Sequence, residues 1–222
     1  MSEAIRILST KKLLPNQKQF LLNAEFSVIE ADFIETKSTD FEVKNVNETL
    51  IFTSQNGVQS VLQHPKCEEL KSKKVFCVGL KTKALLEENG FKVEAHTGYA
   101  ADLAEIITLV YPNESYTFFS GNLRRDTLPE ALTEAGITFN EIEVYQTLLT
   151  PQKIDTKVDG ILFFSPSGVE SYLKKNKITS EIAFCIGETT AEAASQFGIK
   201  NIVIANQPTI ENTIIQCINE FK

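Results

Sequence analysis

The sequence has few of the residues that metal sites and disulfide frameworks need. It holds two histidines and four cysteines, and no two cysteines form a CxxC pair. Neither His64 nor His96 belongs to a pattern with the spacing of metal ligands, so no metal site is expected. Cys77 and Cys185 lie inside apolar runs, where cysteine behaves as a small buried hydrophobe. These features predict a reduced, cytoplasmic protein without disulfides.

Long hydrophobic runs and an excess of positive charge are also absent. No apolar run approaches the roughly 20 residues of a membrane-spanning helix. The first ten residues, MSEAIRILST, contain no apolar stretch of signal-peptide length, so no secretory leader is expected. The formal net charge is −7. Because nucleic acids and anionic membranes attract basic surfaces, this charge argues against both as partners.

The remaining composition, 42% hydrophobic and 23% charged over 222 residues, is that of an ordinary globular protein with one large domain or two small ones. Short apolar runs alternate with helical patterns along the chain, which is typical of α/β domains with parallel sheets. Helices are expected at residues 17–26, 83–89, 102–109, about 128–135 and 210–218, and an Ala-rich helix around residues 191–194 is expected to end at Gly198. Gly90 is expected to follow the end of the helix at residues 83–89. Strands are expected between the helices, including residues 139–149 and 202–204.

One strand–turn–helix unit occurs twice. Residues 161–173, ILFFSPSGVESYL, pass from a buried-strand pattern through a turn to a helical pattern. Residues 50–62, LIFTSQNGVQSVL, repeat this order. Ser54 stands where the earlier helix begins and is expected to cap it, and either Ser165 or Ser167 can cap the later one. The free N–H groups and the positive end of such a helix suit an anion.

The spacing of the two units indicates an internal duplication. The offset from Ser54 to Ser165 is 165 − 54 = 111, half of the 222 residues. Ser9 and Ser120 keep the same offset, and the strand residues Cys77 and Cys185 differ by 108. Alternating strands and helices in both halves predict two doubly wound parallel α/β domains. We expect a ligand in a cleft between them, at the carboxyl ends of the strands.

Six short motifs occur in order along the chain: IFTSQNGV, VFCVG with Thr82, FSGNLRRDTLPEAL, VYQT, FFSPSG and IGETTAEAA. Together they resemble the uroporphyrinogen-III synthase family, from about residue 50 to the C-terminus. The N-terminal segment departs from the family's pattern. ILSTKKLLPNQKQF lacks the usual Arg-Pro after the first strand, and the helix end at Ala24 and Glu25 lacks a glycine.

The resemblance implies two flavodoxin-like α/β domains of similar topology that are interleaved in sequence. Domain 1 would combine residues 1–33 with 152–222, and domain 2 would comprise residues 40–143. Residues 34–39 and 144–151 would cross between the domains as a two-stranded β-ladder. So slender a linker predicts domains that move.

The resemblance also implies a function. Members of the family are lyases that cyclise hydroxymethylbilane, a linear tetrapyrrole, to uroporphyrinogen III and release water. The terminal pyrrole ring is inverted through a spiro intermediate, without any cofactor. This chain would then be a cytoplasmic monomer of haem biosynthesis. Its task would be to hold one reacting geometry and to speed the loss of the hydroxyl group.

The substrate is polyanionic and the protein is net negative, so backbone amides are expected to hold the carboxylates. Five turns would supply them, at residues 54–57, 79–82, 120–123, 165–168 and 187–190. The residues expected to bind substrate are Thr53, Ser54, Asn56, Gly57, Thr82, Ser120, Gly121, Asn122, Ser165, Ser167, Gly168, Thr189 and Thr190. The three threonines in positions 82, 189 and 190 are also expected to cap helices. Lys11, Lys12, Arg124 and Arg125 are candidates for added positive charge.

Tyr145, in the motif VYQT, is the candidate catalytic acid. A phenol stays protonated at neutral pH and can donate to a departing hydroxyl. A simpler interpretation stays open, because strand tyrosines commonly pack on their neighbours and serine turns are commonly only helix caps. Arg124 and Arg125 have the alternative of a solvated surface. Glu188 would repel an anion and is expected to point away or to complement the helix dipole.

Two other functions remain open on the sequence. One is a non-catalytic two-domain protein that binds a small molecule, against which the missing leader counts. The other is an inactive tetrapyrrole-sensing module, against which Tyr145 and the threonines argue. The isomer formed from fresh hydroxymethylbilane distinguishes a synthase, which yields type III, from both alternatives, which leave only type I.

Overall fold

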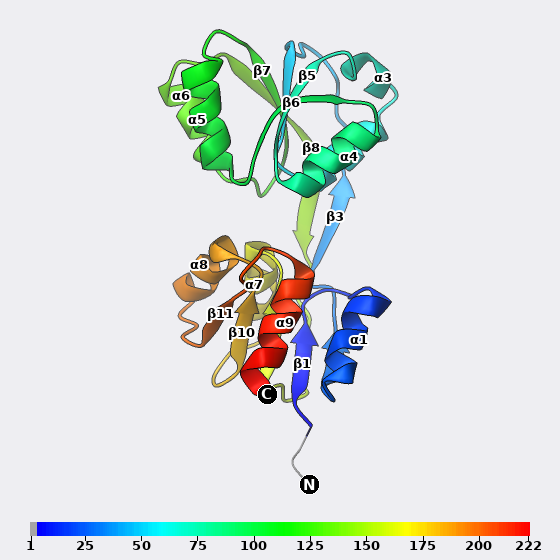
Figure 1. Ribbon diagram of the computed structural model, residues 1–222, viewed down its shortest axis with the longest axis vertical. Helices are drawn as coiled ribbons and strands as arrows, with labels where there is room; N and C mark the ends of the chain where they lie inside the picture. Colours follow the sequence, from blue (N-terminus) through cyan, green and yellow to red (C-terminus); the bar gives the residue numbers. More distant parts are fainter. Residues whose placement is uncertain (1–3) are drawn as a thin grey trace. The chain divides into compact units, whose positions relative to one another are not determined.

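A computed structural model describes residues 4–222, which divide into two compact units (Figure 1). Unit 1 comprises the described residues up to Glu35 together with Leu148–Lys222, and unit 2 comprises Thr36–Thr147. Each unit has a predominantly parallel sheet with helices on both faces, so the predicted α/β class is confirmed. The predicted domain limits stay a prediction, and residues 1–3 of domain 1 lie outside the described residues.

Unit 1 has a five-stranded parallel sheet in the order β11-β10-β9-β1-β2. Its strands are β1 (Arg6–Ser9), β2 (Ser27–Glu30), β9 (Gly160–Phe163), β10 (Ile182–Cys185) and β11 (Ile202–Ile204). Helices α7 (Pro166–Leu173) and α8 (Glu188–Gln196) pack on one face, and α1 (Pro15–Asn23) and α9 (Ile210–Phe221) on the other. Numbered within the unit, the strand order is the flavodoxin-like 2-1-3-4-5.

Unit 2 contains most of a six-stranded sheet in the order β3-β8-β7-β4-β5-β6. Its strands are β3 (Ile34–Ser38), β4 (Thr49–Phe52), β5 (Lys74–Val78), β6 (Lys92–Thr97), β7 (Tyr116–Gly121) and β8 (Phe139–Leu149). Helices α2 (Gln55–Leu62), α3 (Cys67–Leu70) and α4 (Leu80–Glu88) pack on one face, and α5 (Ala100–Val110) and α6 (Thr127–Glu134) on the other. The short helix α3 was not predicted.

The two halves of the duplication exchange their first segments. In unit 1, β1 of the first half pairs with β9 of the second, with Leu8 opposite Ile161. In unit 2, β7 of the second half pairs with β4 of the first, with Phe118 opposite Ile51. The offset of 111 equates β7 with β1 and β4 with β9, so both sheets have the same spatial order. Sequential domains split at residue 111 are therefore ruled out.

Strands β3 and β8 form an antiparallel ladder, and the boundaries between the units fall inside these strands. The hydrogen bonds at the two ends of the ladder are equivalent. The N–H of Thr39 donates to the carbonyl oxygen of Val144 (3.1 Å), and the N–H of Thr150 donates to that of Phe33 (2.9 Å). Both donors and acceptors are related by the repeat offset, since 150 − 39 = 111 and 144 − 33 = 111. Each threonine hydroxyl also donates to the carbonyl before its main-chain acceptor, at 3.2 and 2.8 Å. The duplication thus extends to individual hydrogen bonds.

One buried hydroxyl shows where the halves have diverged. Ser60 Oγ lies 2.9 Å from Ser38 Oγ, so the two hydroxyls share a hydrogen bond. Ser171 corresponds to Ser60 (171 − 60 = 111) but, within residues 4–222, its buried Oγ has no hydrogen-bond partner. The residue that corresponds to Ser38 is Leu149 (38 + 111 = 149), whose side chain can neither donate nor accept a hydrogen bond. The orphaned hydroxyl follows from this single substitution within the repeat.

In the described part of the chain, four helices are followed by a residue in the left-handed backbone conformation, and one of these residues is not glycine. Gly90, Gly136 and Gly198 follow α4, α6 and α8 with φ of 85°, 67° and 83°. At each, paired hydrogen bonds back into the last turn form a Schellman motif. The predicted stops at Gly90 and Gly198 are therefore confirmed. After α1 the same position is Glu25, with φ of 66°, which strains a residue that has a Cβ.

Replacing Glu25 with glycine is expected to raise the free energy of unfolding by about 0.5–1 kcal/mol, because relief of the left-handed strain exceeds the added entropy of the unfolded chain. The midpoint of urea unfolding measures this. Gly136→Ala, at the repeat-related position, is the control and should lower the midpoint. A midpoint of Glu25→Gly at or below that of the wild type would show that the left-handed conformation of Glu25 does not destabilise the protein.

Candidate functional site

The residues expected to bind substrate gather at the carboxyl edges of the two sheets. In unit 2, Ser54 and Gly79 follow the parallel neighbours β4 and β5. In unit 1, Ser165 and Gly187 follow the parallel neighbours β9 and β10. Neighbouring parallel strands end at the same edge, so each unit presents a set of turns and helix starts there, as in other ligand-binding α/β sheets.

The predicted cap at Ser54 is confirmed, and of the two candidates for α7 the cap is Ser165 and not Ser167. Ser54 Oγ accepts a hydrogen bond from the N–H of Asn56 (3.1 Å) at the start of α2. Ser165 Oγ accepts from the N–H of Gly168 (3.0 Å) at the start of α7 and lies 3.1 Å from Ser167 Oγ. Each cap occupies one amide of the first turn. The other first-turn amides have no partner within the helix and can serve an anion, apart from Pro166, which has no N–H.

The predicted threonine caps are wrong. Helix α4 begins at Leu80 with Gly79 as its N-cap, and α8 begins at Glu188 with Gly187 as its N-cap. Gly79 follows β5 directly and Gly187 follows β10 after one residue, and each helix begins at the next residue, so Thr82, Thr189 and Thr190 lie inside the first turn. Thr82 and Thr190 are buried there. These threonines lie at the two edges without capping either helix.

The turn at residues 120–123 also differs from the prediction. Strand β7 continues through Gly121, and helix α6 begins only at Thr127, so no helix start follows directly. The N–H of Asn122 donates to the carbonyl oxygen of Tyr145 (3.3 Å). The Asn122 side chain accepts from the N–H of Thr147 (2.8 Å) and donates to its carbonyl (3.3 Å). This turn is therefore hydrogen-bonded to β8 and presents no free amides of a helix start.

Tyr145 lies on β8 with its ring directly over Gly121. A Cβ on Gly121 would lie 2.3 Å from Tyr145 Cζ, and a Cβ on Gly57 would lie 3.8 Å from Tyr145 Cε1. An irregularity in the pairing of β7 with β8 moves the register between Ser120 and Gly121, which sets Tyr145 opposite Gly121. The structure thus brings the candidate acid beside the start of α2, where Ser54 caps the helix.

The candidate cation Arg124 is already paired. Its guanidinium donates two hydrogen bonds to Glu141 (2.6 and 2.9 Å) and also bonds Asp126. Burial alone would raise the pKa of Glu141, but hydrogen bonds from Arg124 and Ser120 outweigh it and hold that pKa below its usual value. The charge of Arg124 is therefore compensated within the turn. Sequence reasoning missed Glu141, because only the register of β7 against β8 brings it there.

The remaining candidates divide between surface and core. Lys11, Lys12 and Glu188 are exposed at the edge of unit 1. Cys77 and Cys185 are fully buried, as predicted, and burial raises the pKa of their thiols to about 11 and about 12. Over residues 4–222, no group of three or more histidine, cysteine or acidic side chains is arranged to hold a metal ion. No helix in this range is long and apolar enough to cross a membrane.

Doubly wound sheets with capped helix starts at their carboxyl edges define an α/β protein of the small-molecule-binding class. The family model for uroporphyrinogen-III synthase HemD matches residues 18–215. The chain belongs to the uroporphyrinogen-III synthase family, which acts in tetrapyrrole biosynthesis.

Individual relatives agree with this membership. A uroporphyrinogen-III synthase of Chlorobaculum parvum is 30% identical over 179 residues, which cover 70% of this chain and 72% of that protein. A porphyrin biosynthesis protein HemD of Ruminiclostridium josui is 26% identical over 185 residues, or 74% of this chain, but the match spans only 36% of that longer protein.

Two crystal structures share the fold. That of a uroporphyrinogen-III synthetase from Helicobacter pylori has a TM-score of 0.75 at 21% identity and covers 97% of this chain and 99% of its own. That of a mutant uroporphyrinogen III synthase from Thermus thermophilus has a TM-score of 0.68 at 18% identity and covers 98% of each chain.

Substitution of Gly121 by alanine tests the placement of Tyr145. The added methyl group would meet the ring at 2.3 Å, so the ring or strand must shift. We expect a loss of about 1–3 kcal/mol in unfolding free energy and a changed tyrosine near-UV signal. Gly98→Ala is the matched control, because a Cβ there has no atom within 4 Å. Equal stability and spectra for the two variants would show that the ring does not cover Gly121.

Proposed function

We propose that the protein is a cofactor-independent uroporphyrinogen-III synthase and acts as a cytoplasmic monomer. It would cyclise hydroxymethylbilane to uroporphyrinogen III, inverting the terminal pyrrole through a spiro intermediate and releasing water. Family membership supports the reaction. The position of Tyr145 over Gly121, beside the start of α2, is the observation that carries the mechanism. Fresh hydroxymethylbilane with the enzyme, followed by oxidation, should yield the type III isomer; type I alone would overturn the proposal.

Backbone amides hold the substrate's carboxylates in this proposal. The chain has a net charge of −7, and the guanidinium of Arg124 is already paired with Glu141 and Asp126, so neither the overall charge nor Arg124 attracts an anion. The starts of α2, α4, α7 and α8 each present amides and the positive end of a helix, which bind anions without formal charge. The turn at residues 120–123 supports Tyr145 instead.

Tyr145 acts as the general acid. Its phenol donates a proton to the departing hydroxyl, the carbon–oxygen bond breaks, and water leaves together with that proton. The cationic azafulvene that remains is stabilised by the bound substrate's own carboxylates. The substituted α-carbon of the terminal pyrrole attacks this cation and forms the spiro intermediate. The bond from that carbon to its original methylene bridge then breaks, which leaves a cationic azafulvene on the neighbouring ring. The free α-carbon of the terminal pyrrole attacks this second cation, and the proton lost from that carbon restores the phenol.

Tyr145→Phe is expected to lower kcat by about 10²-fold and to change KM far less, because removal of a general acid affects the transition state while the ring keeps its packing. Type III formation is measured after subtraction of the spontaneous type I product. Tyr111→Phe, at the opposite end of unit 2, is the control and should leave kcat unchanged. Equal turnover for Tyr145→Phe would remove Tyr145 from the mechanism.

Ser54→Leu and Ser165→Leu are expected to raise KM about 10-fold each, because the bulk blocks the neighbouring amides from an anion. The serine-to-alanine variants at both positions are the controls: they remove the caps, worth about 1 kcal/mol of stability, without adding bulk. Steady-state kinetics at fixed ionic strength separates the two effects. An unchanged KM in both leucine variants would exclude these helix starts from substrate binding.

A further inference from the structure

Three large apolar side chains lie exposed at the carboxyl edge of unit 2. Leu80, Tyr99 and Leu123 keep 73%, 61% and 52% of their surface accessible. Each stands two residues beyond the end of a strand, after β5, β6 and β7 respectively. These strands are parallel, so the three residues share the edge that also holds Ser54 and Tyr145.

The fold itself does not require apolar residues at these positions. By the repeat offsets, Leu80 corresponds to Glu188 (188 − 80 = 108) and Leu123 corresponds to Lys12 (123 − 12 = 111). Tyr99 precedes α5 as its N-cap, and the corresponding helix α9 has Thr209 at that position. Unit 1 thus forms the same sheet with polar or charged residues at all three places. The apolar edge is specific to unit 2.

Stability of unit 2 does not explain these residues either. Side chains that stay more than half exposed gain little from burial, and apolar residues grouped beside polar turns commonly mark a binding surface. The neighbouring helix starts present amides, which can hold carboxylates but offer nothing to the flat apolar face of a pyrrole ring. A linear tetrapyrrole has both kinds of surface.

We propose that Leu80, Tyr99 and Leu123 form the surface on which the pyrrole rings and their methylene bridges bind. This inference deepens the proposed function and rests on it. Apolar contact positions the rings next to Tyr145 and removes water from around the cation that forms when the hydroxyl leaves. The three are positioning residues, since none transfers a proton.

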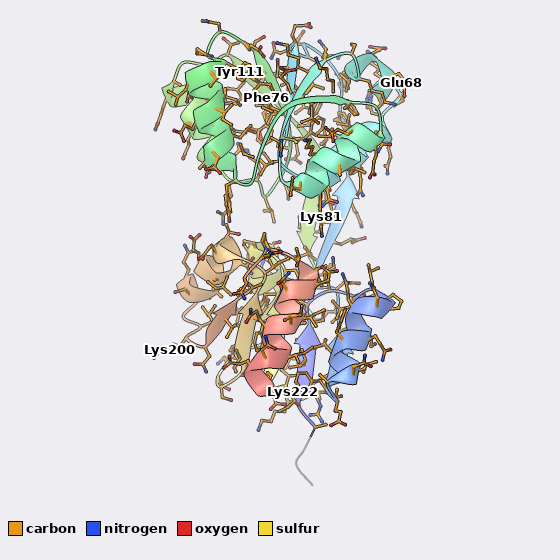
Figure 2. The ribbon with its side chains drawn as sticks, in the orientation of Figure 1. Glu68, Phe76, Lys81, Tyr111, Lys200 and Lys222 are labelled. Carbon is orange, nitrogen blue, oxygen red and sulfur yellow. The ribbon has the colours of Figure 1, made fainter. Side chains whose placement is uncertain are left out.

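The test is replacement of Leu80 and Leu123 by serine, singly and together, in the full-length chain. KM for hydroxymethylbilane should rise about 10-fold in each single variant and further in the double variant. Leu109→Ser is the matched control, since Leu109 is 72% exposed at the far end of α5. Figure 2 shows that Lys81, next to Leu80, and Tyr111, which follows α5, lie at opposite ends of unit 2.

Further measurements separate binding from other causes. Leu80→Met should restore a near-normal KM, and Tyr99→Phe should retain activity that Tyr99→Ser loses. The rise in KM should persist at high salt, because apolar contacts are not screened. All variants should keep the wild-type midpoint of urea unfolding.

The outcomes are distinct. A wild-type protein that forms no type III isomer overturns the proposed function and this inference with it. An active wild type whose Leu80→Ser, Leu123→Ser and double variants all match Leu109→Ser overturns this inference alone. A higher KM in the edge variants, with normal kinetics in Leu109→Ser, supports it.

Discussion

Parallel pairing between opposite halves of the chain is the constraint on which both units depend. Neither half of the chain forms a complete sheet by itself. Strand β1 of the first half pairs with β9 of the second, and β4 of the first half pairs with β7 of the second. These pairings bring the carboxyl ends of distant strands to shared edges, and thereby place turns from different parts of the sequence together. Because of this exchange the chain must pass between the units twice, and the two crossing segments, β3 and β8, pair as an antiparallel ladder.

The edge of unit 2 joins three kinds of chemistry within one sheet. Helix starts provide amides, Tyr145 provides a hydroxyl that lies over a glycine, and the apolar side chains provide a surface that water does not compete for. In the proposed binding mode, an acidic protein could hold a polyanionic substrate, because dipoles and apolar contacts do not depend on net charge. The compensated Arg124 agrees with this division, as its role is to hold the turn that supports Tyr145.

Sequence reasoning succeeded where the signal is local or repeated. The bounds of β8 and β11, the serine caps and the helix stop at Gly90 follow from apolar runs, turn chemistry and the offset of 111. It failed where tertiary pairing decides. Gly79 and Gly187 displaced the threonine caps, and the pairing of Asn122 with β8 removed the expected helix start. Neither the contact of Tyr145 with Gly121 nor the pairing of Arg124 with Glu141 can be found without the register of two strands.

The exchanged segments also set an order for folding during synthesis. Unit 2 is continuous, so its sheet can close once β8 has left the ribosome. The β1–α1–β2 segment must instead wait for β9, which begins 160 − 30 = 130 residues after β2 ends. At roughly 5–20 residues per second this delay is on the order of ten seconds. During it Ile7, Leu8 and Leu21 lack the partners that later bury them completely, so the nascent β1–α1–β2 segment exposes apolar surface until β9 emerges.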